Sequence, residues 1–427
     1  MAKLQSSIPG FAYFPAREET IPIAQGFLDG RKHVDGAEDL WRIGNNLYDL
    51  ANWAHSHPGG SEWILLTKGT DITEAFETHH VSNRAERMLP KFFVRKAKTE
   101  RSAPFTFETG HFYKKFKERA LIALGNVNYH KPSVKSNMIA DFLATTTLIA
   151  CLSAAMTQTW TAIIIAAVFH CWTTISGHNY FHMRDNFRMY YFDISLMSSK
   201  EWRITHVMSH HMYPNTLWDF ELYAFEPFLQ WLPRADKAFV PRFFSALYSP
   251  LVWTLLFFMQ GFKRYHSVIF VWKKIELRDL VPFVLPFAMC LVAPIRFQAI
   301  GMWLIIIGIS SLLFGFIGLT AAHHHPDIFH DGDIYRDSLD WGLLELDAVR
   351  DRRIVDDNHF LSLTNFGLHS LHHLLPTVDH GYLPLCQAAL EETCAEFGIC
   401  IDRLTSWQLI KGQFDQLRRI EPKKNSL

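Results

Sequence analysis

Three clusters of histidine, all after residue 170, have the spacing of metal ligands. In HNYFH, His178 and His182 are four residues apart, so a helix would place both on one face. In HVMSHH the first two histidines are again four apart, and the third would lie about 100° round the helix. In HSLHH the spacing is i, i+3 and i+4. The clustered residues are His178, His182, His206, His210, His211, His369, His372 and His373. They exceed what one four-coordinate zinc ion needs, so we predict a site for two metal ions.

The setting of the clusters narrows the chemistry. Imidazole suits zinc, copper, iron or nickel, so the ligand type alone does not name the metal. All three clusters border apolar segments, where ionisable groups are costly and usually mark function. A metal ion that meets a lipid chain and oxygen there would do redox chemistry, which zinc cannot do. The alternative is three unrelated groups of structural or surface histidines.

Length and composition set the outer bounds. The chain has 427 residues, which predicts two or three domains. Its net charge is zero, so nothing attracts it generally to nucleic acid. The 35 phenylalanines and long uncharged runs are typical of a membrane protein. The six cysteines include no CxxC pair and are interpreted as reduced thiols. The N-terminal segment lacks the apolar core of a secretory signal, so we expect it to be cytosolic.

Apolar runs predict the elements that hold the clusters. Residues 138–156 and 160–177 form one predicted transmembrane hairpin, and 280–294 and 300–322 form a second. The run 243–262 is expected to lie at the membrane interface, because a further crossing would put the third cluster on the wrong side. By the positive-inside rule, both termini and the clusters face the cytosol. The basic residues behind this orientation are Lys131, Lys135, Arg184, Arg188, Lys200 and Arg203.

A compact domain is predicted ahead of the membrane segments. LWRIGNNLYDL alternates like a strand that turns at Gly44, and two short helices are expected at 62–66 and 71–79. Directly before the first of these helices lies HPGG, whose proline and glycines permit a tight turn beside a bulky ligand. HPGG, then GTDIT, then a phenylalanine four residues before His80, resembles the haem-binding domain of cytochrome b5.

The resemblance to cytochrome b5 implies that His57 and His80 are the axial ligands of one haem b, with His79 as the rival to His80. Two opposed histidines saturate the iron, so such a haem transfers electrons rather than binding oxygen. Asp71, Glu74 and Glu77 could form an acidic docking rim for an NADH-linked b5 reductase, or simply a solvated helix face.

Five regions follow from these patterns. Residues 1–37 are a lead-in without clear periodicity. Residues 99–137 are a basic linker with a helix that is expected either against the membrane surface or as a soluble charged helix. HHHPDIFHDGD supplies one further metal ligand, expected to be one of His323, His324 and His325. Asp185, Asp327 and Asp331 are candidates for orienting the ligands. The regions are 1–37, the haem-binding domain 38–98, the linker 99–137, the membrane domain 138–400 and a cytosolic tail 401–427.

The three clusters resemble the histidine boxes of membrane fatty acid desaturases over roughly residues 137–400: HxxxH, HxxxHH and HxxHH. With the haem domain in front, the layout is similar to b5-fused desaturases. Front-end desaturases of this type usually begin the third box with glutamine, where this chain has His369. The expected fold is a small α+β cytochrome b5-like domain followed by an all-α multi-pass membrane domain with about four transmembrane helices and interfacial helices.

The resemblance implies two non-haem irons without bridging carboxylates, with O₂ as co-substrate. Electrons would pass from reductase to haem to iron, and hydrogen would be removed from an acyl chain held in an apolar tunnel between the hairpins. Arg184, Arg188, Lys200 and Arg203 could hold a CoA or lipid phosphate, or be ordinary positive-inside charge. The expected location is the endoplasmic reticulum membrane. Two alternatives stay open: a lipid hydroxylase with the same site, and a non-catalytic membrane-anchored electron carrier.

Overall fold

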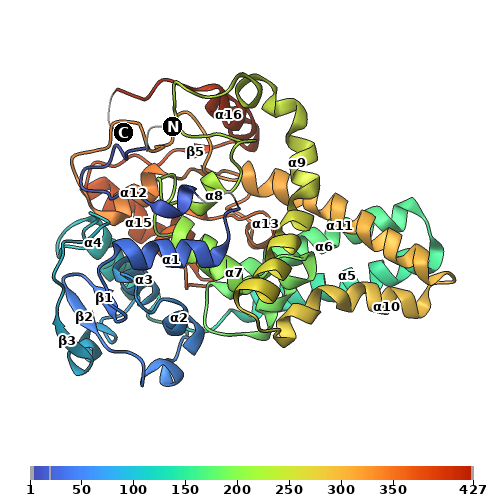
Figure 1. Cartoon of the computed structure of the whole chain (residues 1–427), viewed down its shortest axis with the longest axis horizontal. Coiled ribbons are helices and arrows are strands. Elements are labelled where there is room, and N and C mark those ends of the chain that lie inside the picture. The colour runs from blue at the N-terminus through green and yellow to red at the C-terminus, as the bar shows by residue number, and fades with distance from the viewer. Residues whose placement is uncertain (1–3, 19–20, 425–427) are drawn as a thin grey trace.

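The computed structural model describes residues 4–18 and 21–424 and has the predicted class of fold. A small domain with a three-stranded sheet packs beside a helical body, from which long helices project (Figure 1). By length and composition, four helices among the described residues could cross a membrane.

The small domain has the elements expected from its sequence. Strands β1 (Trp41–Ile43) and β2 (Asn46–Tyr48) form an antiparallel hairpin, and β3 (Phe93–Lys96) pairs with β2. Gly44 allows the hairpin turn because its φ is +58°, a left-handed value that glycine adopts at little cost. The helices α2 (Ser61–Leu66) and α3 (Thr73–His79) confirm the two predicted short helices.

The N-terminal lead-in is more ordered than its sequence predicts. It contains α1 (Ala24–Val34), and the rings of Phe11 and Phe14 are buried against Trp218. The Ser6 hydroxyl and the Ser7 amide both donate to Asp331, which ties the segment to the far half of the chain. The lead-in is therefore part of the core of the helical body.

The basic helix α4 (Phe112–Ala123) packs on the protein along one face. Phe112, Tyr113 and Phe116 are buried in the body of the protein. Lys114 pairs with Glu77 of the small domain (2.6 Å). This face of α4 therefore joins the small domain to the body, and contact of its other face with a membrane stays a prediction.

Two helical hairpins project from the body. In the first, α5 (Val134–Thr157) packs along α6 (Trp160–Phe181), and in the second α10 (Val284–Val292) packs along α11 (Arg296–Leu319). Their tips meet where the Gln158 amide donates to Gln298 (2.7 Å). Prolines break the predicted span 280–294 into η8 (Leu277–Phe283) and the short α10. At about 1.5 Å per α-helical and 2.0 Å per 3₁₀ residue, the two pieces together are about 28 Å long, close to the hydrocarbon thickness.

The long helix α9 (Phe239–His266) lies across the base of the hairpins (Figure 1). Its length and composition would allow it to cross a membrane. Both of its ends, however, contact the helical body. Near its start Arg242 donates to the carbonyl of Arg418 (3.1 Å), and near its end Arg264 pairs with buried Asp193 (3.0 Å). The four candidate spans of the described chain include this helix and not the predicted span 280–294, so the interfacial placement expected for 243–262 stays a prediction.

The remaining elements cover the open base of the hairpins. C-terminal helices pack on α4 and α9, and a short parallel pair of strands joins the chain at 351–352 to 403–404. These elements are α7 (Ser199–Trp202), η6 (Arg203–His210), α8 (Phe220–Tyr223), α12 (Trp341–Asp347), β4 (Asp351–Arg352), α13 (His359–Thr364), α14 (His369–Leu374), α15 (Gln387–Glu396), β5 (Arg403–Leu404) and α16 (Ser406–Arg418). Shorter helical turns are η1 (Pro15–Glu18), η2 (Ala54–Ser56), η3 (Glu86–Lys91), η4 (Phe187–Tyr191), η5 (Asp193–Ser195), η7 (Ser267–Val271) and η9 (Leu383–Cys386).

Candidate metal centres

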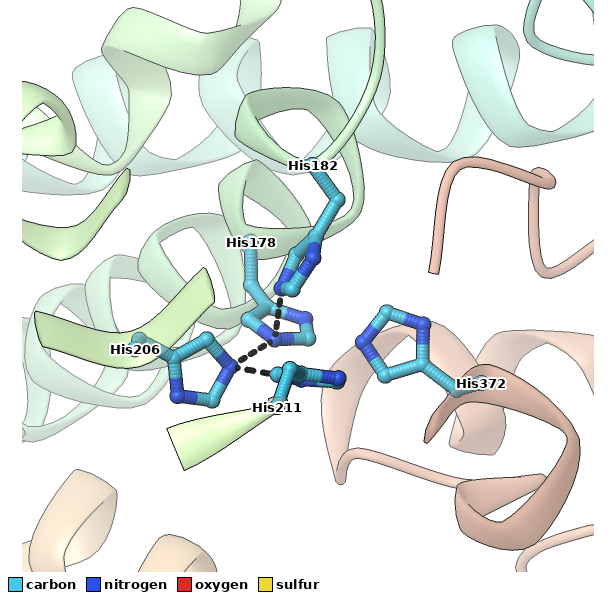
Figure 2. A group of neighbouring side chains, drawn as sticks. All are labelled: His178, His182, His206, His211 and His372. Atoms are coloured by element: carbon cyan, nitrogen blue, oxygen red, sulfur yellow. Dashed lines mark hydrogen bonds between the residues drawn. The ribbon is translucent and has the colours of Figure 1, made fainter. Parts of the chain in front are cut away.

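The histidines of all three clusters meet at the base of the hairpins and separate into two groups. The first group takes members from α6, η6 and α14, and Figure 2 shows their rings converging on one point. The second takes members from η6, α14 and the segment after α11. The first group is His178, His182, His206, His211 and His372. The second group is His210, His323, His369 and His373.

Ring nitrogens within the first group lie close enough to share an ion. The Nε2 atom of His178 is 2.8 Å from Nε2 of His206 and 3.0 Å from Nε2 of His182. Nε2 of His211 is 3.1 Å from Nε2 of His206. Nitrogens bound at right angles to one ion at about 2.1 Å would lie about 3.0 Å apart, which matches these separations. Both ring nitrogens of His372 are buried without a hydrogen-bond partner among the described residues.

Of the three consecutive histidines 323–325, one belongs to the second group. Nε2 of His323 is 3.0 Å from Nε2 of His210 and 2.7 Å from Nε2 of His369. His324 instead stacks on Trp231, with ring centroids 4.0 Å apart. His325 lies nearer the surface, beside Asp327. His323 is therefore the member of the triplet that reaches the other imidazoles.

The second cluster is not α-helical, contrary to the geometry assumed from its sequence. Residues Arg203–His210 form a π-helix, in which the amide of His211 donates to the carbonyl of His206, five residues back (2.8 Å). π-Helical turns are rare and are frequent at functional sites. As a result His206 and His211 contribute to the first group, while His210 points into the second.

Carboxylates and carbonyls on the outer side orient the rings. Glu221 accepts from Nδ1 of His206 (2.6 Å), and Asp219 accepts from Nδ1 of His210 (3.0 Å). Glu345, fully buried on α12, lies 2.7 Å from Nδ1 of His373. Fixing Nδ1 in this way leaves Nε2 free for a metal. These three carboxylates were missed from the sequence, although Asp219 and Glu221 lie only a few residues beyond the second cluster.

The three aspartates that the sequence suggested for this orienting role contact other groups. Asp185 is exposed and pairs with Arg203 (2.8 Å). Asp327 is exposed and lies beside His325. Asp331 is buried but accepts from the N-terminal segment and from the amide of Leu217. The hydrogen bonds recorded for these three aspartates go to other groups than the clustered imidazoles.

The chemistry of the donor set fits metal ions. Burial lowers the pKa of His182, His211 and His372, so these rings are neutral, as metal ligands must be. Burial also lowers the pKa of His210, but Asp219 and Glu221 outweigh it and raise that pKa to about 9. An ion in the second group would therefore displace a proton from His210.

A separate pair of histidines faces across the crevice of the small domain. The ring centroids of His57 and His80 are 6.1 Å apart, roughly the separation of two imidazoles that share one axial metal. Nδ1 of His57 bonds to the carbonyl of Gly60 (2.9 Å), and Nδ1 of His80 bonds to the carbonyl of Phe76 (2.8 Å). His79 turns away and packs against Trp63. The geometry thus fits a haem between His57 and His80 and not one bound by His79.

The predicted acidic rim of the small domain is internal, so that interpretation was wrong. Asp71 and Glu74 are buried and pair with Arg101 (2.7 and 2.5 Å). The Tyr213 hydroxyl, close to the second histidine cluster, donates to Glu74 (2.9 Å). Glu77 accepts from α4, as described above. These acids therefore fasten the small domain to the body instead of facing a partner.

Most of the basic side chains near the histidines also have carboxylate partners within the protein. Arg203 is buried and pairs with Glu62 (2.8 Å), and Arg188 pairs with Asp141 (2.6 Å). Lys200 lies 3.6 Å from a carboxylate oxygen of Glu276 and over the ring of Trp272. Arg184 is exposed. Three of the four candidates for a phosphate site therefore already have internal partners.

Comparison with known proteins agrees with both halves of this architecture. Residues 155–404 match the family described as fatty acid desaturase, and residues 29–98 match the cytochrome b5-like heme/steroid binding domain. The chain is 40% identical over 419 residues to a cytochrome b5-related protein of Drosophila melanogaster, covering 96% of this chain and 95% of the relative. It is 22% identical to an acyl-lipid (8-3)-desaturase of Mortierella alpina, covering 88% and 92%. No solved structure matches it significantly.

Proposed function

Because this chain belongs to the fatty acid desaturase family and carries a cytochrome b5-like domain, we propose that it is a membrane-bound fatty acyl desaturase fed by its own haem. One observation carries the proposal: nine buried histidines from distant segments converge as two adjacent groups of ring nitrogens. A pair of irons held there would supply activation of O₂ and removal of hydrogen from an unactivated CH₂ group.

The roles of the residues follow from their positions. We assign the first and second groups of histidines as ligands of two irons, and His57 and His80 as ligands of one haem. Glu221, Asp219 and Glu345 hold the Nδ1 sides of three ligands, so that Nε2 is presented without reorganisation. Two opposed imidazoles leave a haem no open position, so the small domain is suited to moving electrons one at a time.

The fused arrangement suits this supply of electrons. A haem domain joined to the body by buried ion pairs stays beside the histidine groups, so its effective concentration does not depend on diffusion. An NADH-linked b5 reductase is the proposed donor. An apolar cavity of about 520 Å³ beside α9, lined by Phe258, Phe262 and Phe283, is a candidate position for an acyl chain.

The proposed location is the endoplasmic reticulum membrane, with both termini and the histidine groups on the cytosolic side. The support is electrostatic: basic residues gather at the outer ends of the first hairpin, and such residues favour the cytosolic side. The turn between α5 and α6, by contrast, carries no charged residue.

The test is to purify the full chain in lipid nanodiscs and measure metal, haem and product. A desaturase should contain about two non-haem irons per haem. In cells that express it, lipid analysis should reveal acyl chains lighter by two hydrogens. Acyl chains heavier by one oxygen would instead identify a hydroxylase. A protein that binds haem but no other iron and leaves the lipids unchanged would be an electron carrier, and the proposal would be wrong.

A further inference from the structure

A partly buried tryptophan of the small domain packs against the core of the membrane domain. Trp63 is on α2, yet its side chain packs against the hydrophobic cluster that contains Phe181 and Phe192 of the membrane domain. Other aromatic side chains of the small domain, such as Trp53, pack within that domain's own core. Trp63 is therefore a point at which the two halves share one packed interior.

On the haem side, Trp63 contacts the residue next to the proposed axial ligand. Its ring centroid is 5.3 Å from that of His79, with the rings nearly perpendicular. His79 precedes His80 in the chain, and its Nε2 is buried without a hydrogen-bond partner in the described part of the chain. This orientation argues against His79 as the haem ligand. Its side chain therefore has no other role proposed above.

On the metal side, Trp63 is joined to the first group through Arg203 and Phe181. The guanidinium of Arg203 lies 4.6 Å from the centre of the Trp63 ring, a cation–π contact. Arg203 is buried and donates from Nε to the carbonyl of Phe181 (3.0 Å). Phe181 in turn stacks on His182, with ring centroids 5.1 Å apart and planes 23° apart.

The ion pairs around this contact hold it in place. Arg203 also pairs with Glu62, the residue before Trp63, and Glu62 pairs with Arg278 (2.8 Å). The pKa of Glu62 is lowered, because Arg278 and Arg203 outweigh the burial that would raise it, so its carboxylate is ionised at neutral pH. A cavity of about 510 Å³ opens beside the pairs, while Trp63 fills the packed side of the interface.

We propose that Trp63, held between His79 and Arg203, is the residue through which electrons pass from the haem to the first group of histidines. The inference rests on the proposed function above. In each transfer one electron leaves ferrous haem, which becomes ferric, and reduces one ferric non-haem iron to ferrous. The indole ring undergoes no net oxidation. The ring fills the space between the two domains with packed atoms. Electronic coupling decays less steeply with distance through packed atoms than through a gap.

The test follows a single electron in the full-length, oxidised, iron-loaded protein without oxygen. A flash of light on a deazaflavin donor reduces the haem, and the ferrous haem band then decays as the electron moves to the non-haem iron. Trp63→Leu should slow this decay by about tenfold or more while leaving haem spectrum, iron content and photoreduction of the haem unchanged. Trp63→Phe, which keeps an aromatic ring, should slow it by about threefold. Trp53→Leu is the matched control and should stay within about twofold of the parent protein.

The outcomes separate the two levels of the proposal. A Trp63→Leu protein that decays within about twofold of the parent rate would overturn the role of Trp63 and leave the proposed function intact. If Trp63→Leu fails to retain haem or iron, Trp63→Phe decides, and an unchanged rate there also overturns the role. Parent protein that lacks non-haem iron would overturn the proposed function itself. Parent protein that holds iron but shows no decay would overturn both.

Discussion

The two regions proposed to bind metal differ in what holds their imidazoles. In the small domain, Nδ1 of His57 and of His80 bond to backbone carbonyls three and four residues away in the chain. At the base of the hairpins, the partner of His206 is 15 residues away, that of His323 is 25 away and that of His373 is 28 away. The haem pair is therefore oriented by its own loops, whereas these three of the nine histidines are oriented by distant segments of the chain. His369 is an exception, because its Nδ1 bonds to the nearby carbonyl of Phe366.

This difference predicts which substitutions should disrupt each site. A local site tolerates change elsewhere in the chain, because the loop that carries each ligand also orients it. A site assembled from α6, η6, α14 and the segment after α11 requires all four to be in register. We therefore expect substitutions among the segments that assemble the nine histidines to affect the proposed iron site while sparing the haem.

The largest expected effect is on the second group of histidines. His323→Ala should abolish desaturation, a loss of more than about a hundredfold, because a ring that faces His210 and His369 is removed. Non-haem iron should fall while the haem spectrum stays intact. His325→Ala, two residues away and beside exposed Asp327, is the control and should keep iron and turnover. If His325→Ala were the variant that lost iron, the grouping would be wrong.

The converse substitution tests the independence of the haem pair. His80→Ala should lose the haem absorbance band, since one of two opposed ligands is removed, while non-haem iron is retained. His79→Ala should keep the band, because His79 packs on Trp63 outside the haem crevice. Absorbance spectra and iron analysis of the purified proteins measure both. Loss of the band in His79→Ala alone would restore His79 as the ligand.

Docking of the two regions is expected to depend on one arginine. Arg101→Met removes the nearest cation from the buried acids Asp71 and Glu74, which should cost about 3–5 kcal/mol of the free energy of unfolding. Denaturant unfolding followed by haem absorbance measures it. Arg95→Met breaks a half-exposed pair with Glu38 and should cost less than about 1 kcal/mol. Equal costs for the two variants would mean that the buried pairs do not secure the small domain.

The smallest effect is expected from a residue that contacts a proposed ligand but is not a ligand itself. Glu345→Gln keeps the shape of the side chain but replaces the carboxyl group beside Nδ1 of His373 with an amide, and should weaken iron binding by about 10–100-fold. Titration of metal-free protein with ferrous iron measures it. Asp327→Asn, an exposed aspartate outside both groups, should bind iron as the parent does. Unchanged affinity in Glu345→Gln would show that long-range support is not what distinguishes this site.

What the sequence predicted was mostly local. The β1–β2 hairpin, α2, α3 and the first hairpin all follow from turn residues and periodicity within one segment. The histidine clusters were visible because their spacing reflects single helical turns. The family comparisons then bear out the two-part architecture.

What it did not predict depends on contacts between distant segments. The lead-in has no periodicity, and Phe14 is ordered by Trp218, about 200 residues further on. Lys114 lies in a segment whose pattern predicts a helix at the membrane surface, but in the structure it pairs with Glu77. The π-helical turn at His206, and the choice of His323 over its two neighbours, also become visible only once the segments are packed.

The meeting of the hairpin tips at Gln158 and Gln298 has a topological consequence. Only two residues separate α5 from α6, and three separate α10 from α11. The described turns at the tips are therefore short and carry little polar surface. In the orientation proposed above, a water-soluble partner would have to approach from the side of the helical body.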